Sequence, residues 1–137
     1  MVGCESRMLG TVKHRFATAA PATRYSPAYS KEVTMRFLLK VNIPVESGNA
    51  AAKAGKLGAT IQSILAEQKP EAAYFTDDNG QRTALIFLEM KDASQIPAIA
   101  EPWFLAFNAS VELHPVMVPD DLARAGGAIE QAVKKYA

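Results

Sequence analysis

Two side chains two residues apart, Glu112 and His114, are the pair in this sequence best suited to acid–base chemistry. His114 is the only histidine after residue 34, and histidine is the side chain whose ordinary pKa lies near neutrality. In an extended strand, residues two apart point to the same face, so this carboxylate and imidazole are expected side by side. His114 is therefore a candidate catalytic acid or base.

Lys40 and Asn42 are expected on the neighbouring strand with the same orientation, and Glu89 on a third strand. In a catalytic interpretation, His114 moves a proton and Lys40 or Asn42 stabilises an enolate-like oxyanion. Glu112 and Glu89 are then candidate ligand-binding residues. In a structural interpretation, the same groups hydrogen-bond one another across a dimer and only fix its register, because buried polar groups must be satisfied.

Two aromatic residues, Tyr74 and Trp103, are further candidates for ligand binding. Trp103, Phe104 and Phe107 recur at helical spacing, which fits either the wall of a ligand cavity or ordinary packing of a helix on a sheet. Tyr74 is expected either to line a cavity or to lie at an open sheet edge. The sequence contains no Ser/His/Asp set, phosphate-binding glycine loop or carboxylate-rich metal motif, so no cofactor and no metal is expected.

Four strands are expected to position these residues. Residues 35–43 alternate, which places on one face Phe37, Leu39, Val41 and Ile43. Strands at 71–76 and 81–90 flank Asp77-Asp78-Asn79-Gly80, whose turn chemistry predicts a β-hairpin and accounts for the two aspartates. A fourth strand is expected at 109–118, and Pro115 places it at a sheet edge.

Three helical regions connect or follow these strands. The first begins at Ser47 or Asn49 and ends at Pro70, and its two glycines, Gly55 and Gly58, indicate either a weakened helix or close approach to the sheet. The second begins at Asp92 or Ser94. It carries Pro97 in its first turn and Pro102 further on, so we expect a bent or two-piece helix.

The third helical region follows Pro119, and Gly126-Gly127 is expected to kink it. Its apolar residues lie on one side at helical spacing, namely Leu122, Ile129, Val133 and Tyr136.

The element order β-α-β-β-α-β-α predicts an α+β domain of ferredoxin-like βαββαβ topology plus a C-terminal helix. Its antiparallel four-stranded sheet is expected in the order 4-1-3-2, with helices on one face only. The opposite face would then receive Leu38, Lys40, Asn42, Leu85, Phe87, Glu89, Glu112, His114 and Val116. Four of these nine are apolar, which predicts that a second copy covers the face and forms a homodimer.

Composition limits the functional class. The 137 residues are 49% hydrophobic and 21% charged, as in ordinary globular proteins. The formal charge of +1 divides into +3 for residues 1–34, with five Lys or Arg against two Glu, and −2 for residues 35–137. An acidic domain argues against nucleic-acid binding, and no apolar run suits a membrane. The only cysteine is Cys4, so a reducing, cytoplasmic location is expected.

Residues 1–34 lack helical or strand periodicity and are expected to be a disordered N-terminal extension of a domain at 35–137. Their basic, acid-poor composition is typical of a targeting peptide. The preferred alternative is a translated leader: Lys-Glu-Val-Thr-Met can be encoded by a purine-rich bacterial ribosome-binding sequence followed by a start codon, which makes Met35 the true first residue.

Four stretches, MRFLLKVNIP, AAYFTDDNGQRTALIFLE, EPWFLAF and VELHPVMVPDDL, resemble small uncharacterised bacterial proteins of the dimeric α/β-barrel superfamily. The resemblance covers residues 35–137 and implies the fold and the dimer. The superfamily includes cofactor-independent monooxygenases, lactone isomerases, chlorite-dismutase-like and haem-degrading enzymes, and proteins of no known activity. No catalytic motif accompanies the resemblance. Haem is not expected, because His114 lies on a strand and His14 in the suspected leader.

The sequence therefore predicts a small cytoplasmic homodimer that binds a small organic molecule, or serves as an assembly module, without demonstrable catalysis. The alternative is a cofactor-independent enzyme of the monooxygenase or isomerase kind. A third interpretation, a regulatory or partner-binding module, predicts an exposed apolar patch that remains after dimerisation.

Overall fold

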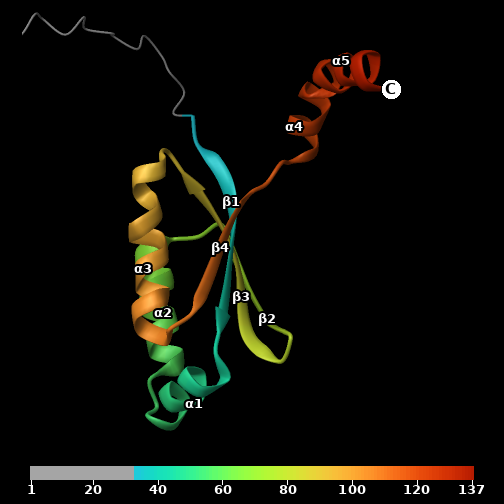
Figure 1. Ribbon diagram of the computed structural model, residues 1–137. Coiled ribbons are helices and arrows are strands. Elements are labelled where there is room, and N and C mark those ends of the chain that lie inside the picture. Colours follow the sequence, from blue (N-terminus) through green and yellow to red (C-terminus); the bar gives the residue numbers. More distant parts are fainter. Residues whose placement is uncertain (1–32) are drawn as a thin grey trace, which may run out of the picture. The chain divides into compact units, whose positions relative to one another are not determined.

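The computed structural model describes residues 33–137, which form an α+β domain with a four-stranded antiparallel sheet (Figure 1). The expectations for residues 1–34 fall outside the described residues, apart from Val33 and Thr34. The elements follow in the order β1 (Met35–Ile43), α1 (Val45–Lys53), α2 (Leu57–Gln68), β2 (Ala72–Asp78), β3 (Gln81–Met90), α3 (Ile96–Phe107), β4 (Ser110–Pro115), α4 (Pro119–Arg124) and α5 (Gly126–Tyr136).

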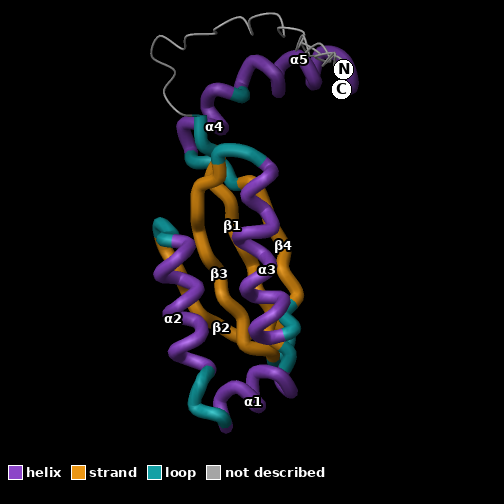
Figure 2. The backbone as a smooth tube through the Cα atoms, turned by 90° about the vertical axis from the view of Figure 1, so that its left-hand side faces the viewer, coloured by secondary structure: helices purple, strands orange, loops and turns teal. Residues whose placement is uncertain are grey.

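The sheet has the strand order β2-β3-β1-β4, which is the predicted order counted from the other edge. All three pairings are antiparallel, and β4 lies at an edge, as Pro115 indicated. Helices α2 and α3 lie side by side on one face of the sheet (Figure 2). Neither α2 nor α3 covers the opposite face (Figure 1). We call that opposite face the open face.

The core lies between the sheet and the helices and follows from strand alternation. Leu39, Val41 and Ile43 of β1 are buried, which confirms the predicted inward face of this strand. The rest of the core comes mainly from β3 and α3, with Ala84, Ile86, Leu88, Met90, Trp103 and Phe107. Within residues 33–137, no helix combines the length and apolar character needed to cross a membrane.

The first helical region differs from the prediction. Helix α1 begins at Val45, directly after Pro44, so neither Ser47 nor Asn49 caps it. The single predicted helix is divided into α1 and α2 at Gly55, which adopts φ +70°. A Cβ atom added at Gly55 or Gly58 would meet no atom within 4 Å, so close approach to the sheet is wrong for both glycines.

The proline-containing region also differs in part. Helix α3 runs unbroken across Pro102, so the alternative of two pieces divided there is wrong. Pro97 lies in its first turn, as predicted. A short 3-10 helix, Ala93–Gln95, precedes α3, and the Asp92 carboxylate caps it by accepting a hydrogen bond from the Ser94 backbone N–H at 2.8 Å. The C-terminal region divides into α4 and α5 next to the two glycines where a kink was predicted.

The two glycines of this helical region provide a matched test of the backbone. Gly55→Ala forces a side chain into the left-handed region and should lower the free energy of unfolding by about 1–2 kcal/mol. Gly58→Ala, in open space within α2, should raise it by about 0.5–1 kcal/mol, because alanine loses less chain entropy on folding. Urea unfolding of both variants measures the difference. Equal effects of the two substitutions would contradict the assignment of Gly55 as the break.

Candidate functional site

The open face of the sheet gathers most of the residues that the sequence singled out. In the register, Leu38 lies opposite Phe87 on one side and His114 on the other, and Lys40 lies opposite Leu85 and Glu112. Because directly paired residues of antiparallel strands share a face, the predicted membership of this face is confirmed for the strand residues. Val116 follows β4, and its N–H donates to the Arg36 carbonyl at 3.1 Å.

A polar cluster crosses the open face at the end nearest the β2–β3 turn. The Lys40 ammonium lies 2.6 Å from the Asp78 carboxylate, and the Asn42 amide donates to the same carboxylate oxygen at 3.2 Å. These side chains reach from β1 across β3 to β2. The β3 residue directly opposite Asn42 is Thr83, which is buried, and its hydroxyl donates to the Gln81 carbonyl.

The position of Asp78 corrects one prediction. Asp77 and Asp78 were assigned to the turn, but both belong to β2, and the turn consists of Asn79 and Gly80, each with positive φ. Asp78 therefore points to the same face as Tyr74, while Asp77 points to the other. The sequence contained the signal for this placement. Asn79-Gly80 predicts a two-residue turn, so the residue before it, Asp78, ends the first strand.

The ion pair shifts the pKa of both partners. The hydrogen bond from Lys40, followed by that from Asn42, lowers the pKa of the Asp78 carboxyl. The same hydrogen bond raises the pKa of Lys40, and the charge of Glu112 adds to this effect. Lys40 is thus held as a cation between a carboxylate it contacts and a second one nearby. It is a poor proton donor at neutral pH and suits a charge-stabilising or structural role.

A second ion pair crosses the other end of the open face. The Arg36 guanidinium forms a bidentate ion pair with the Glu71 carboxylate. Its Nε donates at 2.7 Å and one terminal nitrogen at 3.2 Å. The hydrogen bond and the charge of Glu71 raise the pKa of Arg36. Glu71 was not singled out in the sequence. Glu89, a predicted ligand-binding residue, lies near this end and accepts a hydrogen bond from the Thr34 hydroxyl at 3.1 Å.

The predicted acid–base pair lies at the sheet edge. His114 Nε2 and Glu112 Oε2 are 3.1 Å apart, and both side chains are more than half exposed. Neither residue lines any of the five cavities described for residues 33–137. His114 is not brought into contact with Lys40 or Asn42, whose hydrogen bonds go to Asp78. A solvent-exposed imidazole–carboxylate pair is chemically able to move protons, but this pair is open to solvent and lies in the wall of none of these five cavities.

The two predicted aromatic ligand-binding residues lie on opposite sides of the sheet. Tyr74 is 61% exposed on the open face, and its ring meets Phe87 edge-on at a centroid distance of 6.4 Å. Trp103 is fully buried in the helix-side core, where its indole N–H donates to the Gln68 side chain at 3.4 Å. Phe107 packs beside it and is also buried, whereas Phe104 is 40% exposed.

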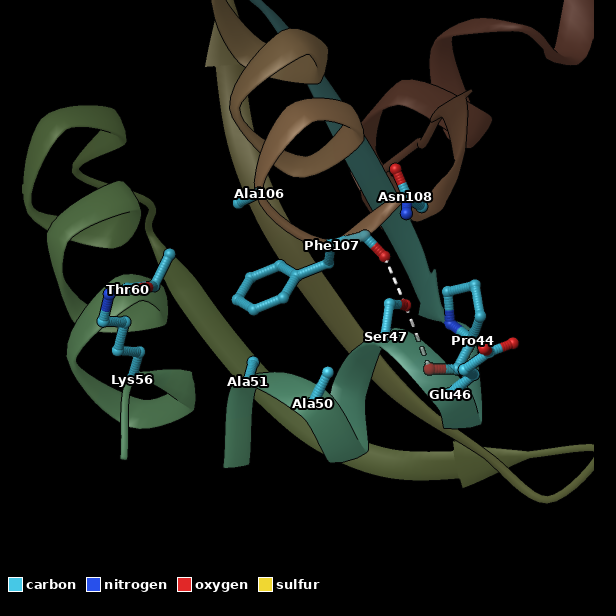
Figure 3. Close-up of a pocket in the computed structure, with 10 residues that line it drawn as sticks. All are labelled: Pro44, Glu46, Ser47, Ala50, Ala51, Lys56, Thr60, Ala106, Phe107 and Asn108. Carbon is cyan, nitrogen blue, oxygen red and sulfur yellow. Dashed lines mark hydrogen bonds between the residues drawn. The ribbon is translucent and has the colours of Figure 1, made fainter. Parts of the chain in front are cut away.

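The largest of these five cavities lies elsewhere, at the end of the helix layer (Figure 3). It measures about 740 Å³ and is lined by α1, the start of α2 and the end of α3. The Ser47 hydroxyl in its wall donates to the backbone carbonyls of Phe107 at 2.5 Å and Pro44 at 3.2 Å (Figure 3). Ser47 therefore ties α1 to α3 and is not an activated nucleophile. None of the predicted site residues lines this cavity.

No family model, curated protein or solved structure matches this chain. Among the described residues, no group of three His, Cys, Asp or Glu side chains is arranged to hold a metal ion.

The Lys40–Asp78 ion pair should make the free energy of unfolding depend on pH. The folded-state pKa of Asp78 lies below its unfolded value, so its contribution is present above about pH 4 and is lost as pH falls through the folded-state pKa. Asp78→Asn should therefore lower the melting temperature at pH 7, and its difference from the unsubstituted protein should shrink as the pH falls below about 4. Asp77→Asn, one residue away on the other face, is the control and should change little. Identical pH profiles for both variants would contradict the role of Asp78.

Proposed function

We propose that this chain works as a homodimer in which the open sheet faces of two ferredoxin-like subunits pack together in a dimeric α/β-barrel. We further propose that the dimer binds a small organic molecule without catalysing its conversion. The observation that carries the dimer proposal is the layout of the open face, which has an apolar centre between two cross-sheet ion pairs.

The apolar centre is formed by side chains of three adjacent strands, Leu38, Tyr74, Leu85 and Phe87. Three of them are only partly buried, and Tyr74 is mostly exposed. On one side lies Arg36–Glu71 and on the other Lys40–Asp78. An apolar centre inside a polar rim is the usual anatomy of a protein interface. A two-fold axis through this centre would place the same patch of both copies in contact.

The ion pairs lower the free-energy cost of burying this face. Each charged side chain in them already has its partner within the same subunit, so a second copy need not supply one. Burying an unpaired charge costs several kcal/mol, whereas a paired and hydrogen-bonded one costs much less. The part of the face between these two ion pairs can therefore be dehydrated without leaving Arg36, Glu71, Lys40 or Asp78 as a lone charge.

Helix α5 provides a second apolar surface for the same partner. It contains no buried residue, and its apolar side is exposed at Ile129, Val133 and Tyr136. An isolated helix of 11 residues is marginal in water and is normally stabilised by packing of its apolar face. We propose that α5 packs on the other subunit and extends the interface beyond the sheet.

The enzyme alternative has less support. It requires His114 to act together with Lys40 or Asn42 on one substrate, but the latter two are engaged by Asp78 and His114 contacts Glu112 at the exposed edge. The distance of 3.1 Å between His114 and Glu112 is the one feature in its favour.

Tyr74 and Phe75 offer a matched test of the sheet-face dimer. They are neighbours on β2, they are 61% and 58% exposed, and they point to opposite faces. Tyr74→Glu should weaken the dimer at least about tenfold, because it buries an unpaired carboxylate in the interface. Phe75→Glu should leave the dimer unchanged. Sedimentation equilibrium measures both dissociation constants, and a stable single subunit at all concentrations, even without substitution, would refute the proposal.

The role of α5 is tested on its exposed side chains, where substitution costs the subunit no core packing. Ile129→Gln combined with Val133→Gln should weaken the dimer several-fold through lost apolar burial. The control is Glu130→Gln with Lys134→Gln, which keeps the net charge and changes the polar side. Light scattering across a dilution series compares the two. If both double variants dimerise as tightly as the unsubstituted chain, α5 does not contribute to the interface.

A further inference from the structure

A small cavity lies on the helix side of the sheet, away from the open face. It measures about 160 Å³, and residues of β1, α2, β2, β3 and α3 form its wall. The apolar residues of this wall are Ile43, Ile61, Phe75, Ala84 and Trp103. We call this space the Trp103 cavity.

Strand alternation explains why there is space beside the indole. Four residues of β3 point toward the helices and are buried, namely Ala84, Ile86, Leu88 and Met90. Ala84 is the smallest of them, and it pairs with Val41 of β1 and Phe75 of β2. A methyl group at this position leaves volume that a longer side chain would occupy.

The polar side chains that border the cavity have hydrogen-bond partners outside it. The Trp103 indole N–H donates to a side chain of α2 at 3.4 Å. The hydroxyls of Thr76 and Thr83 donate to backbone carbonyls of β2 and β3. The Arg82 guanidinium extends to α1, where its two terminal nitrogens donate to the Asn49 side-chain oxygen at 3.1 and 3.0 Å. The guanidinium charge is thus held at α1, and the interior of the cavity is apolar.

Phe75 forms the outer part of the wall. It lies on the helix side because it pairs with Ala84, yet it is 58% exposed, whereas Trp103 and Ala84 are 0% and 1% exposed. The cavity therefore extends from the buried indole to a phenylalanine at the surface. Exposed side chains change rotamer within picoseconds to nanoseconds, so movement of the Phe75 ring can admit a molecule while the domain stays folded.

The size and lining of the cavity select one kind of ligand. An apolar cavity of about 150 Å³ in a protein core accepts a benzene molecule and stays free of water, which needs about two to four polar partners. A charged ligand would lose its hydration in such a cavity without gaining a partner, which is strongly unfavourable. The cavity therefore suits a single ring without charge.

We propose that the Trp103 cavity binds one small uncharged apolar ring, of the size of a monocyclic aromatic hydrocarbon. The ring would lie between Trp103 and Phe75, against the methyl group of Ala84. This inference rests on the proposed binding of a small organic molecule, and it names the chemical class and the place in the fold. It does not depend on the dimer, because the cavity is formed within one subunit.

The chain contains one tryptophan, Trp103, so its single indole N–H resonance reports directly on the cavity in an NMR titration. The probes are toluene, which is uncharged, and benzoate, which adds a carboxylate to the same ring. Toluene should shift the Trp103 resonance in a saturable way. Benzoate should bind at least about tenfold more weakly, because its carboxylate finds no partner in the cavity.

Phe75 and Tyr74 provide a matched pair of variants, because both are mostly exposed and neither substitution removes core packing. Phe75→Ala removes the outer wall and should weaken toluene binding at least about tenfold through lost apolar contact. Tyr74→Ala removes a ring from the open face, outside the cavity, and should bind toluene like the unsubstituted protein.

A third variant fills the cavity from its floor. Ala84→Leu should abolish toluene binding, whereas Ala66→Leu makes the same change at an exposed position of α2 and should leave binding unchanged. An unchanged far-UV circular dichroism spectrum is the check on folding. The proposal is overturned if toluene gives no saturable shift, if benzoate binds as tightly as toluene, if Phe75→Ala and Tyr74→Ala behave alike, or if a folded Ala84→Leu variant binds toluene normally.

Mass spectrometry of an organic extract of the purified protein separates failure of this inference from failure of the proposed function. A co-purified charged or larger molecule, together with a flat toluene titration, would overturn the ligand class and leave small-molecule binding standing. A flat titration with no bound molecule would count against both. The dimer is judged separately by sedimentation of Tyr74→Glu.

Discussion

Burial of only one face of the sheet is the constraint on which the rest of this structure depends. Strand alternation sends Leu39, Val41 and Ile43 toward α2 and α3, where they form the core with Trp103 and Phe107. The same alternation sends Leu38, Leu85 and Phe87 to the open face, where no helix of that layer covers them. A face with this apolar content is unusual for a sheet left in water, and this is the physical basis of the proposed dimer.

The polar residues of the open face take their partners from across the sheet. Lys40 and Arg36, both on β1, reach over β3 to Asp78 and Glu71, so each end of the face is closed by an ion pair. These contacts are partly exposed, and exposed ion pairs contribute little to stability. Their importance lies in position, because they leave a bounded apolar centre. They also occupy Lys40 and Asn42, which separates these residues from His114.

The two sides of the sheet therefore suit different tasks. The open face offers an extended apolar area with paired charges around it, which fits a second copy of the chain. The helix side contains a small, mainly apolar cavity of about 160 Å³ beside Trp103. The edge pair Glu112 and His114 lies on the open face beside Lys40 and Leu38, and neither side chain lines a described cavity. Assembly and ligand binding are thus expected to be separable properties.

The sequence by itself determined the number of strands, their order, the inward face of β1 and the half-apolar open face, because these follow from period-two alternation and from Pro and Asn-Gly signals over short stretches. It did not determine which charged side chains form ion pairs. Asp78 and Glu71 pair with β1 residues far away in the chain, and such contacts depend on register and on the intervening β3 side chains. Only the tertiary structure showed that Trp103 walls a small cavity and that α5 buries none of its residues within the described part of its own subunit.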